Sequence, residues 1–206
     1  MILADIGNRH IHIYEDGKVI HLEFEEAIEY FSSQRLFYIC VNKEANEKIK
    51  RYTVWRDISE FVHIDGEYEG MGVDRRALCL SRGDGLYIDA GSAITIDKVN
   101  GGRYIGGLIL PGFYAYKKAY SSISEKLEFD IEEIEKADIS RLPKGTINQI
   151  SYSIMKPIID TIDSLKGGLP LYITGGDRMI FTNFLPDANF SDSFVFEGII
   201  RALDKK

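Results

Sequence analysis

Val, Ile and Tyr stand at alternating positions within residues 4–20, in the pattern that β-strands produce. Asp16-Gly17 is a strong signal for a two-residue turn between the apolar pairs Ile13-Tyr14 and Val19-Ile20. The pattern therefore predicts a β-hairpin at the amino terminus. Asp5 and Gly7, which interrupt the apolar run ahead of it, are not required for that hairpin.

Further along, the spacing of apolar positions predicts helices that alternate with strands. Strands are predicted at 36–41 and within 169–177, the latter followed by a glycine turn and a short helix. Helices are predicted at 25–34, 43–51, 72–82, after Pro111-Gly112, at 146–166 and at 197–203. Pro157 should kink or break the long helix. The charged stretch 124–144 is most simply a solvated helix with a connection. Strands interleaved with helices indicate an α/β protein.

One segment of the chain repeats. The stretch "ILADIGNRHIHIYEDGKVI" from Ile2 aligns with "LYIDAGSAITIDKVNGGRYI" from Leu86. Each copy reads as a strand, then Asp-x-Gly-polar, then an alternating strand, a glycine turn and a third strand. The alignment pairs Asp5 with Asp89, Gly7 with Gly91 and Asn8 with Ser92. Two copies of one supersecondary unit suggest two lobes.

Composition limits the classes of function. The chain has 206 residues, 45% of them hydrophobic, which suffices for a buried core. A formal net charge of −7 argues against a nucleic-acid or anionic-membrane surface. Cys40 and Cys79 lack metal-ligand spacing and suit a reducing compartment. With no signal peptide or long apolar run, the protein is expected to be soluble and cytoplasmic.

The two Asp-x-Gly turns suggest phosphate chemistry. A glycine lets the backbone approach a phosphate closely, and a neighbouring carboxylate offers an oxygen ligand to Mg²⁺. Asn8 and Arg9 add donors for phosphate oxygens. Facing copies of the turn would hold a metal ion and a nucleotide between one carboxylate from each lobe. A single Asp-x-Gly is a common turn, but two matched copies are more specific, and the signatures of P-loop enzymes and protein kinases are absent.

Three other glycine-rich segments carry candidate chemistry. They are "GMGVDRRA" at 70–77, "GGLILPG" at 106–112 and "TGGD" at 174–177. Each one by itself is an ordinary structural element: a helix N-terminus, a Pro-Gly turn and a strand exit. His10-x-His12 places two imidazoles on one strand face, but no third ligand stands nearby in the sequence, and His21 and His63 are isolated.

In this order, "DIGN", "GVDR", "DAGSAITID" and "GGLILPG" resemble the motifs of the type III pantothenate kinases, over most of the chain from Asp5 to about Gly176. The resemblance implies the duplicated ribonuclease-H-like fold of the actin, sugar-kinase and Hsp70-like ATPases: two lobes, each a mixed sheet flanked by helices. The expected lobes are residues 1–82 and 83–206. The implied activity is ATP-dependent phosphorylation of pantothenate, the first step of coenzyme A biosynthesis.

The resemblance also implies roles for individual residues. The implied ATP-binding residues are Asp5, Ile6, Gly7, Asn8, Arg9 and Ser92. The implied substrate-binding residues are Tyr68, Gly72, Val73, Asp74, Arg75 and Thr146. Asp74 would be the general base, Asp5 would bind Mg²⁺ and Asp89 would bind a monovalent cation, K⁺ or NH₄⁺. The family acts as homodimers.

Two other readings stay open. One is a non-catalytic ATP-binding regulator on the same fold, against which the retention of Asp74 and Arg75 argues. The other is a different small-molecule kinase of the superfamily.

Overall fold

The computed structural model describes residues 1–7 and 10–204, which form two compact units. Unit 1 contains residues 1–83, 101–104 and 192–204, and unit 2 contains residues 84–100 and 105–191. No helix within the described ranges is both long enough and apolar enough to cross a membrane.

Unit 1 is built on a five-stranded sheet. Its elements are β1 (Ile2–Ile6), β2 (Ile11–Glu15), β3 (Lys18–Leu22), α1 (Phe24–Phe31), β4 (Leu36–Cys40), α2 (Lys43–Tyr52), β5 (Arg56–Asp57), the 3₁₀ turn η1 (Ser59–Phe61), α3 (Val73–Leu80) and α7 (Phe194–Asp204). The strand order is β3-β2-β1-β4-β5. Strand β1 pairs antiparallel with β2 and parallel with β4, so the sheet is mixed.

The predicted amino-terminal hairpin is confirmed. Strands β2 and β3 pair from Ile11 opposite Leu22 to Glu15 opposite Lys18. Asp16 and Gly17, which connect them, both have positive φ, 49° and 82°. Two consecutive positive φ values are characteristic of the type I′ turn that matches the twist of a tight hairpin.

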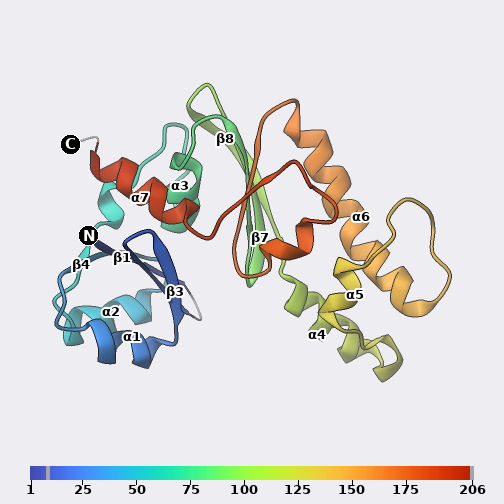
Figure 1. Cartoon of the computed structure of the whole chain (residues 1–206), viewed down its shortest axis with the longest axis horizontal. Helices are drawn as coiled ribbons and strands as arrows, with labels where there is room; N and C mark the ends of the chain where they lie inside the picture. The colour runs from blue at the N-terminus through green and yellow to red at the C-terminus, as the bar shows by residue number, and fades with distance from the viewer. Residues whose placement is uncertain (8–9, 205–206) are drawn as a thin grey trace. The chain divides into compact units, whose positions relative to one another are not determined.

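The two faces of this sheet pack against different helices. Ala4 and Ile6 of β1, with Ile11 and Ile13 of β2, belong to a core that includes Ala27 of α1 and Ile49 of α2. On the other face, the Tyr14 ring stacks on Phe196 of α7, with ring centroids 5.3 Å apart. Figure 1 shows α1 and α2 on one side of the sheet and α3 with α7 on the other.

The carboxyl-terminal helix belongs to unit 1, whereas the sequence-based boundary assigned all of 83–206 to the second lobe. Helix α7 packs along α3, and the Arg82 guanidinium binds the Glu197 carboxylate at 2.7 Å. The contact between the helices is close at Gly198, where an added Cβ would overlap the carbonyl oxygen of Ala77. Apolar residues on both helices decide this placement. A single boundary along the sequence cannot assign the last helix to the first unit.

We expect Gly198→Ala to destabilise the protein by about 1–3 kcal/mol, as overpacking typically does, despite the higher helix propensity of alanine. The neighbouring atom is a backbone carbonyl, so helix α3 would have to move as a whole. Urea unfolding measures the change. Asp204→Ala at the exposed end of the same helix is the control and should stay within about 0.5 kcal/mol of wild type. Equal stability of the two variants would show that the helices separate without cost.

Unit 2 repeats the same sheet topology. Its elements are β6 (Gly85–Ala90), β7 (Ala93–Asn100), β8 (Arg103–Pro111), α4 (Phe113–Ile123), η2 (Glu125–Leu127), α5 (Ile131–Glu135), α6 (Thr146–Lys166), β9 (Leu171–Thr174), η3 (Arg178–Phe181) and β10 (Asn189–Phe190). The strand order β10-β9-β6-β7-β8 is the order of the first sheet read from the other edge. The first sheet's β1 thus corresponds to β6, which confirms the duplication predicted from the repeat.

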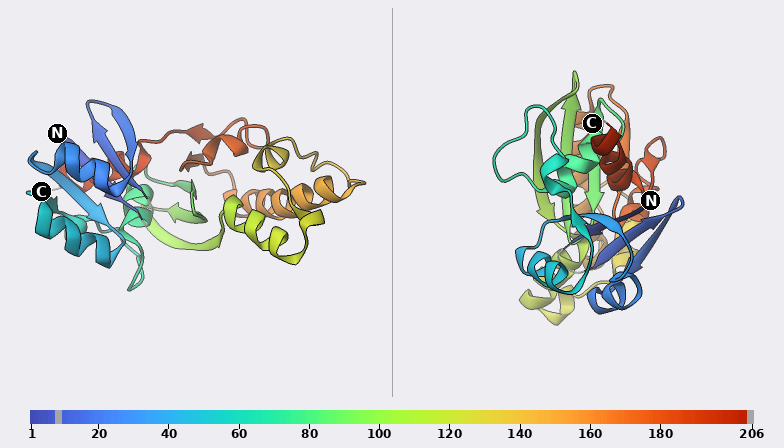
Figure 2. Two further views of the ribbon diagram at one scale, coloured as in Figure 1. Left: turned by 90° about the horizontal axis from the view of Figure 1, so that it is seen from below. Right: turned by 90° about the vertical axis from the view of Figure 1, so that its left-hand side faces the viewer.

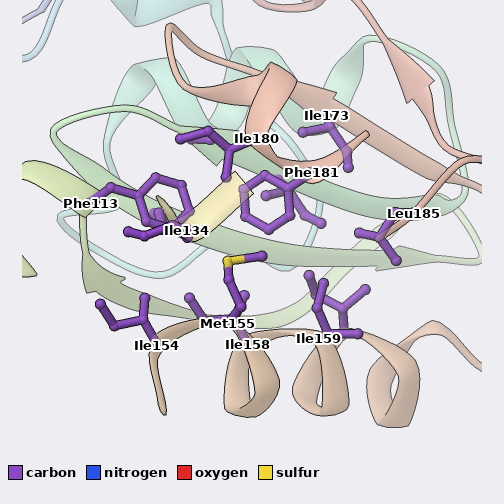
Figure 3. Close-up of a cluster of buried hydrophobic side chains, with 14 of the residues drawn as sticks. Phe113, Ile134, Ile154, Met155, Ile158, Ile159, Ile173, Ile180, Phe181 and Leu185 are labelled. Atoms are coloured by element: carbon purple, nitrogen blue, oxygen red, sulfur yellow. The ribbon is translucent and has the colours of Figure 1, made fainter. Parts of the chain in front are cut away.

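The core of unit 2 lies between its sheet and α6. Ile154, Met155, Ile158 and Ile159 of α6 point toward a cluster that includes Phe181 (Figure 3). Leu86, Ile88 and Ala90 of β6 belong to the same core. The alternate residues of β6, including Asp89, therefore lie on the opposite face of the sheet.

Two expectations for unit 2 need correction. The stretch 124–144 is more than a solvated helix: it contains η2 and α5, and Phe129 and Ile134 are buried in the core. The stretch carries many charges, but one side of it is apolar. Helices α4, α5 and α6 lie next to one another (Figure 2). Of the two alternatives predicted at Pro157, a kink or a break, the break does not occur, because α6 continues through this residue from Thr146 to Lys166.

Candidate active site

Asp5 occupies the next-to-last position of β1, where the chain leaves the first sheet. Gly7 follows directly, and its N–H donates to the carbonyl oxygen of His10 at 3.1 Å, which closes a tight loop after the strand. An added Cβ at Gly7 would lie 3.4 Å from that oxygen, which is van der Waals contact. Ile6 is buried as the last residue of β1. The predicted phosphate donors Asn8 and Arg9 lie outside the described residues.

A hollow of about 210 Å³ opens beside this loop. It is lined by Gly7, His10, Ile11, Phe24, Glu25, Asn42, Glu44, Ala45 and Lys48. Asn42 is the N-cap of α2, and its side chain accepts from the Ala45 N–H at 3.0 Å. Backbone and side-chain polar groups thus gather at the same end of the sheet as Asp5.

His12 lies opposite Asp5 in the β1–β2 register, so both side chains are on the same face of the sheet. Burial, together with the neighbouring His21 and His10, lowers the pKa of His12 to about 4. The His12 imidazole is therefore neutral at neutral pH.

Asp74 lies in the first turn of α3, in the "GVDR" segment. Its Oδ1 accepts the backbone N–H of Arg75 at 2.8 Å. Gly72 is the N-cap of the helix, and a Cβ there would overlap Asp74 Oδ1, so only glycine accommodates this carboxylate position. Val73 is buried and anchors the turn. A carboxylate at a helix N-terminus is also stabilised by the helix dipole.

The Arg75 guanidinium is held by two tyrosines. Its Nη1 donates to the Tyr68 hydroxyl at 2.8 Å and its Nη2 donates to the Tyr104 hydroxyl at 3.2 Å. Arg75 is only 7% exposed, whereas Tyr68 is 48% exposed. The two phenol oxygens accept from different guanidinium nitrogens and so fix the orientation of the Arg75 side chain.

Sequence reasoning missed Tyr104. It lies one residue into the β8 strand, where an aromatic residue is unremarkable, and no motif marks it. The Tyr104 N–H donates to the Asp65 carbonyl at 2.8 Å, and Gly66, with φ of 82°, leaves room for the Tyr104 backbone. Only this long-range pairing places the Tyr104 hydroxyl on Arg75.

In unit 2, Asp89 is the next-to-last residue of β6, as Asp5 is of β1. Its register partners are Thr95 on β7 and Thr174 on β9, so a carboxylate lies between two threonines on one face of the sheet. The Thr95 hydroxyl is buried and has no hydrogen-bond partner among the described residues. The carboxylate and the two threonine hydroxyl groups offer oxygen ligands to a cation.

Glycine turns surround Asp89. A Cβ at Gly175, where φ is 93°, would come 2.5 Å from Asp89 Oδ1. A Cβ at Gly112 would come 2.6 Å from the Ser92 carbonyl oxygen, and the Gly112 N–H donates to that oxygen at 3.3 Å. The turns of "DAGS", "LPG" and "TGGD" thus meet through their backbones, as their glycines require. Burial raises the pKa of Asp177 in the last of these turns.

The predicted site residues thus fall into separate groups within the units. Unit 1 brings Tyr68, Gly72, Asp74 and Arg75 together and places Asp5 and Gly7 at the end of β1. Unit 2 gathers Asp89 and the exposed Ser92 with the glycine turns. Thr146 begins α6 with an exposed side chain, outside that cluster.

Two mixed five-stranded sheets of identical topology, each with an Asp-x-Gly turn after its central strand, define the fold of the actin-like ATPases and sugar kinases. The structure of the ethanolamine utilization protein EutJ from Carboxydothermus hydrogenoformans shares this fold, with a TM-score of 0.50 and 16% identity over 98% of this chain and 88% of that one.

Closer relatives identify the family. The sequence model of the type III pantothenate kinases matches residues 40–166. A type III pantothenate kinase of Helicobacter pylori (strain HPAG1) is 36% identical over 100% of this chain and 92% of its own length. One of Campylobacter jejuni (strain RM1221) is 34% identical over 97% of this chain and 94% of its own. The chain belongs to the type III pantothenate kinase family.

A solved structure is also similar over the full length. It is that of a conserved Campylobacter jejuni protein assigned to the Baf family of transcriptional activators. It superposes with a TM-score of 0.88 at 33% identity, over 100% of this chain and 98% of that one.

Proposed function

We propose that this protein is a kinase that transfers the γ-phosphoryl group of ATP to the primary hydroxyl of pantothenate, in coenzyme A biosynthesis. The arrangement of Asp74 and Arg75 at the start of α3 carries this proposal. It supplies a carboxylate for the hydroxyl, and the neighbouring residue in the helix is an arginine that suits an anionic acceptor. Membership of the type III pantothenate kinase family identifies pantothenate as that acceptor.

Asp74 acts as the general base. An alcohol is a poor nucleophile until its proton is removed, and a carboxylate within about 2.6–3.2 Å of the hydroxyl can accept that proton as the new O–P bond forms. One carboxylate oxygen, Oδ1, is engaged by the Arg75 N–H. That hydrogen bond fixes the direction of the carboxylate.

Arg75 binds the pantothenate carboxylate. A guanidinium suits a carboxylate because its N–H groups form a planar fork. Tyr68 and Tyr104 hold this fork in one orientation, and the exposed Tyr68 ring provides an apolar wall for the substrate.

The loop after β1 in unit 1 and the turns around Asp89 in unit 2 each carry residues that suit ATP or its cations. The backbone at Gly7, with Asn8 and Arg9, contacts the phosphates, and Ser92 adds a hydroxyl. The Asp5 carboxylate suits Mg²⁺, which takes hard oxygen ligands. Asp89, beside the unpartnered buried hydroxyl of Thr95, suits K⁺ or NH₄⁺. When bound, such cations neutralise the charge of the transferring phosphoryl group.

We also propose that the protein is a cytoplasmic homodimer. Strand β8 is the outer strand of its sheet, and Ile105 and Ile109 on it are 59% and 60% exposed. An apolar edge strand of this kind is a pairing surface for a second chain. Cys40 and Cys79 are both thiols, which suits a reducing compartment.

A regulatory function is the second candidate, since the solved structure with a TM-score of 0.88 belongs to a protein assigned to transcriptional activators. The negative net charge gives such a role no electrostatic support for binding DNA. The ordered Asp74–Arg75 pair also favours catalysis over nucleotide binding alone.

A coupled ADP-release assay with a panel of acceptors distinguishes these functions. We expect ADP release to depend on pantothenate, to be absent with sugars and simple alcohols, and to rise when K⁺ or NH₄⁺ replaces Na⁺. ATP binding without release for any acceptor would support the regulator. Release with a different alcohol would assign the chain to another small-molecule kinase.

A further inference from the structure

The first sheet brings two histidines together that the sequence leaves apart. His12 on β2 and His21 on β3 are register partners, so their side chains lie on the same face. Their Nδ1 atoms are 2.5 Å apart, and the rings meet edge to face with centroids 4.7 Å apart. Ordinary hydrogen bonds from a ring N–H span about 2.7–3.2 Å. The two ring nitrogens therefore contact each other more closely than in an ordinary hydrogen bond.

Further ligand groups stand around this pair. The ring centroid of His10 is 6.4 Å from that of His12. His10 Nε2 lies 3.2 Å from the Glu23 carboxylate, and both side chains are about half exposed or more, at 49% and 64%. The histidine pair is thus open to solvent on the side of His10 and Glu23.

We propose that His12 and His21 chelate a divalent first-row transition-metal ion. Zinc-to-imidazole bonds are about 2.0–2.1 Å long. Two such bonds at tetrahedral or octahedral angles need the nitrogens to be about 3 Å apart. The two Nδ1 atoms have to separate by less than about 1 Å to reach that spacing, and the His21 side chain is exposed.

The site is a chelate of two side chains. Among the described residues, no group of three or more histidine, cysteine, aspartate or glutamate side chains is arranged to hold an ion. Water fills the remaining positions. Affinity for a site of this kind follows the order in which Ni²⁺ and Cu²⁺ exceed Mn²⁺ and Co²⁺.

Ligand chemistry separates this site from the cation sites proposed for catalysis. Imidazole favours zinc, copper and nickel, whereas Mg²⁺ prefers carboxylate and water oxygens. Asp5 is the register partner of His12, so the ion would lie close to the loop that we propose binds phosphate. The chelate itself does not depend on that function.

The test uses the full-length chain, free of any added histidine tag and treated with EDTA. Isothermal titration with Ni²⁺ at pH 7.5 should show one site per chain. His21→Ala should weaken that binding at least about tenfold, since one of two ligands is lost. His63→Ala, at the fourth histidine in the chain, is the matched control and should bind as wild type.

Cu²⁺ provides a second readout, independent of affinity and of activity. Its electron paramagnetic resonance spectrum should show coupling to two imidazole nitrogens in wild type and to one in His21→Ala. His21→Gln, which keeps a polar side chain at this exposed position, should behave like the alanine variant. Equal Ni²⁺ affinity in wild type and His21→Ala, or no binding at millimolar Ni²⁺, would overturn the proposal.

Discussion

Asp74→Asn should lower kcat for pantothenate phosphorylation by about 10²–10⁴-fold, the range that a positioned general base contributes. An amide oxygen cannot take the hydroxyl proton at neutral pH. The fold should be unaffected, because asparagine keeps the Oδ1 that accepts the Arg75 N–H. The KM for pantothenate should change little, since Arg75 and its two tyrosines stay in place. Steady-state kinetics and thermal unfolding together measure these effects.

Glu69→Gln is the matched control for Asp74→Asn. It makes the same change from carboxylate to amide on an exposed residue of the segment that leads into α3. We expect it to retain wild-type kcat. Near wild-type turnover in Asp74→Asn would remove Asp74 from the role of base, and a large loss in both variants would point to the charge of the segment instead.

Asp5→Asn should raise the Mg²⁺ concentration needed for half-maximal rate by at least about tenfold. The physical reason is that Mg²⁺ binds a charged carboxylate oxygen in preference to a neutral amide oxygen. Because Asp5 lies at the end of β1 and not in the Asp74–Arg75 cluster, the KM for pantothenate should stay nearly constant. Initial rates over a Mg²⁺ series at fixed ATP give the comparison.

Asp16→Asn serves as the control for this second variant. Asp16 is exposed at the turn of the amino-terminal hairpin, with φ of 49°, a conformation that asparagine adopts readily. Its Mg²⁺ dependence should match that of wild type. An unchanged Mg²⁺ dependence in Asp5→Asn would exclude Asp5 from metal binding.

Local signals predicted much of the fold. The Asp16-Gly17 turn and the alternation of Ile11 and Ile13 are properties of neighbouring residues, and the hairpin forms where they indicate. The repeat around Asp5 and Asp89 predicted two copies of one supersecondary unit, because equivalent segments fold alike. The prediction of a solvated helix was wrong at 124–144, where charged residues dominate the sequence pattern. Phe129 and Ile134 of this stretch are buried in the core of unit 2.

The candidate site divides in the same way. Asp74 and Arg75 were found from the short motif "GVDR". Its glycine, Gly72, leaves room for the Asp74 carboxylate. Tyr104 could not be found, because its contact with Arg75 spans 29 residues and depends on the pairing of Tyr104 with the Asp65 backbone. His21 was likewise isolated in the sequence until the β2–β3 register placed it against His12.

The sequence by itself determined the duplicated α/β architecture, the turns and the identity of the acidic groups, since these follow from residue types within a few positions of one another. The tertiary structure decided which side chains meet. It placed α7 on α3 in unit 1, two tyrosines on Arg75 and one histidine against another. The reason is that such contacts are set by strand register and helix packing between distant segments, and neither is encoded in any one local pattern.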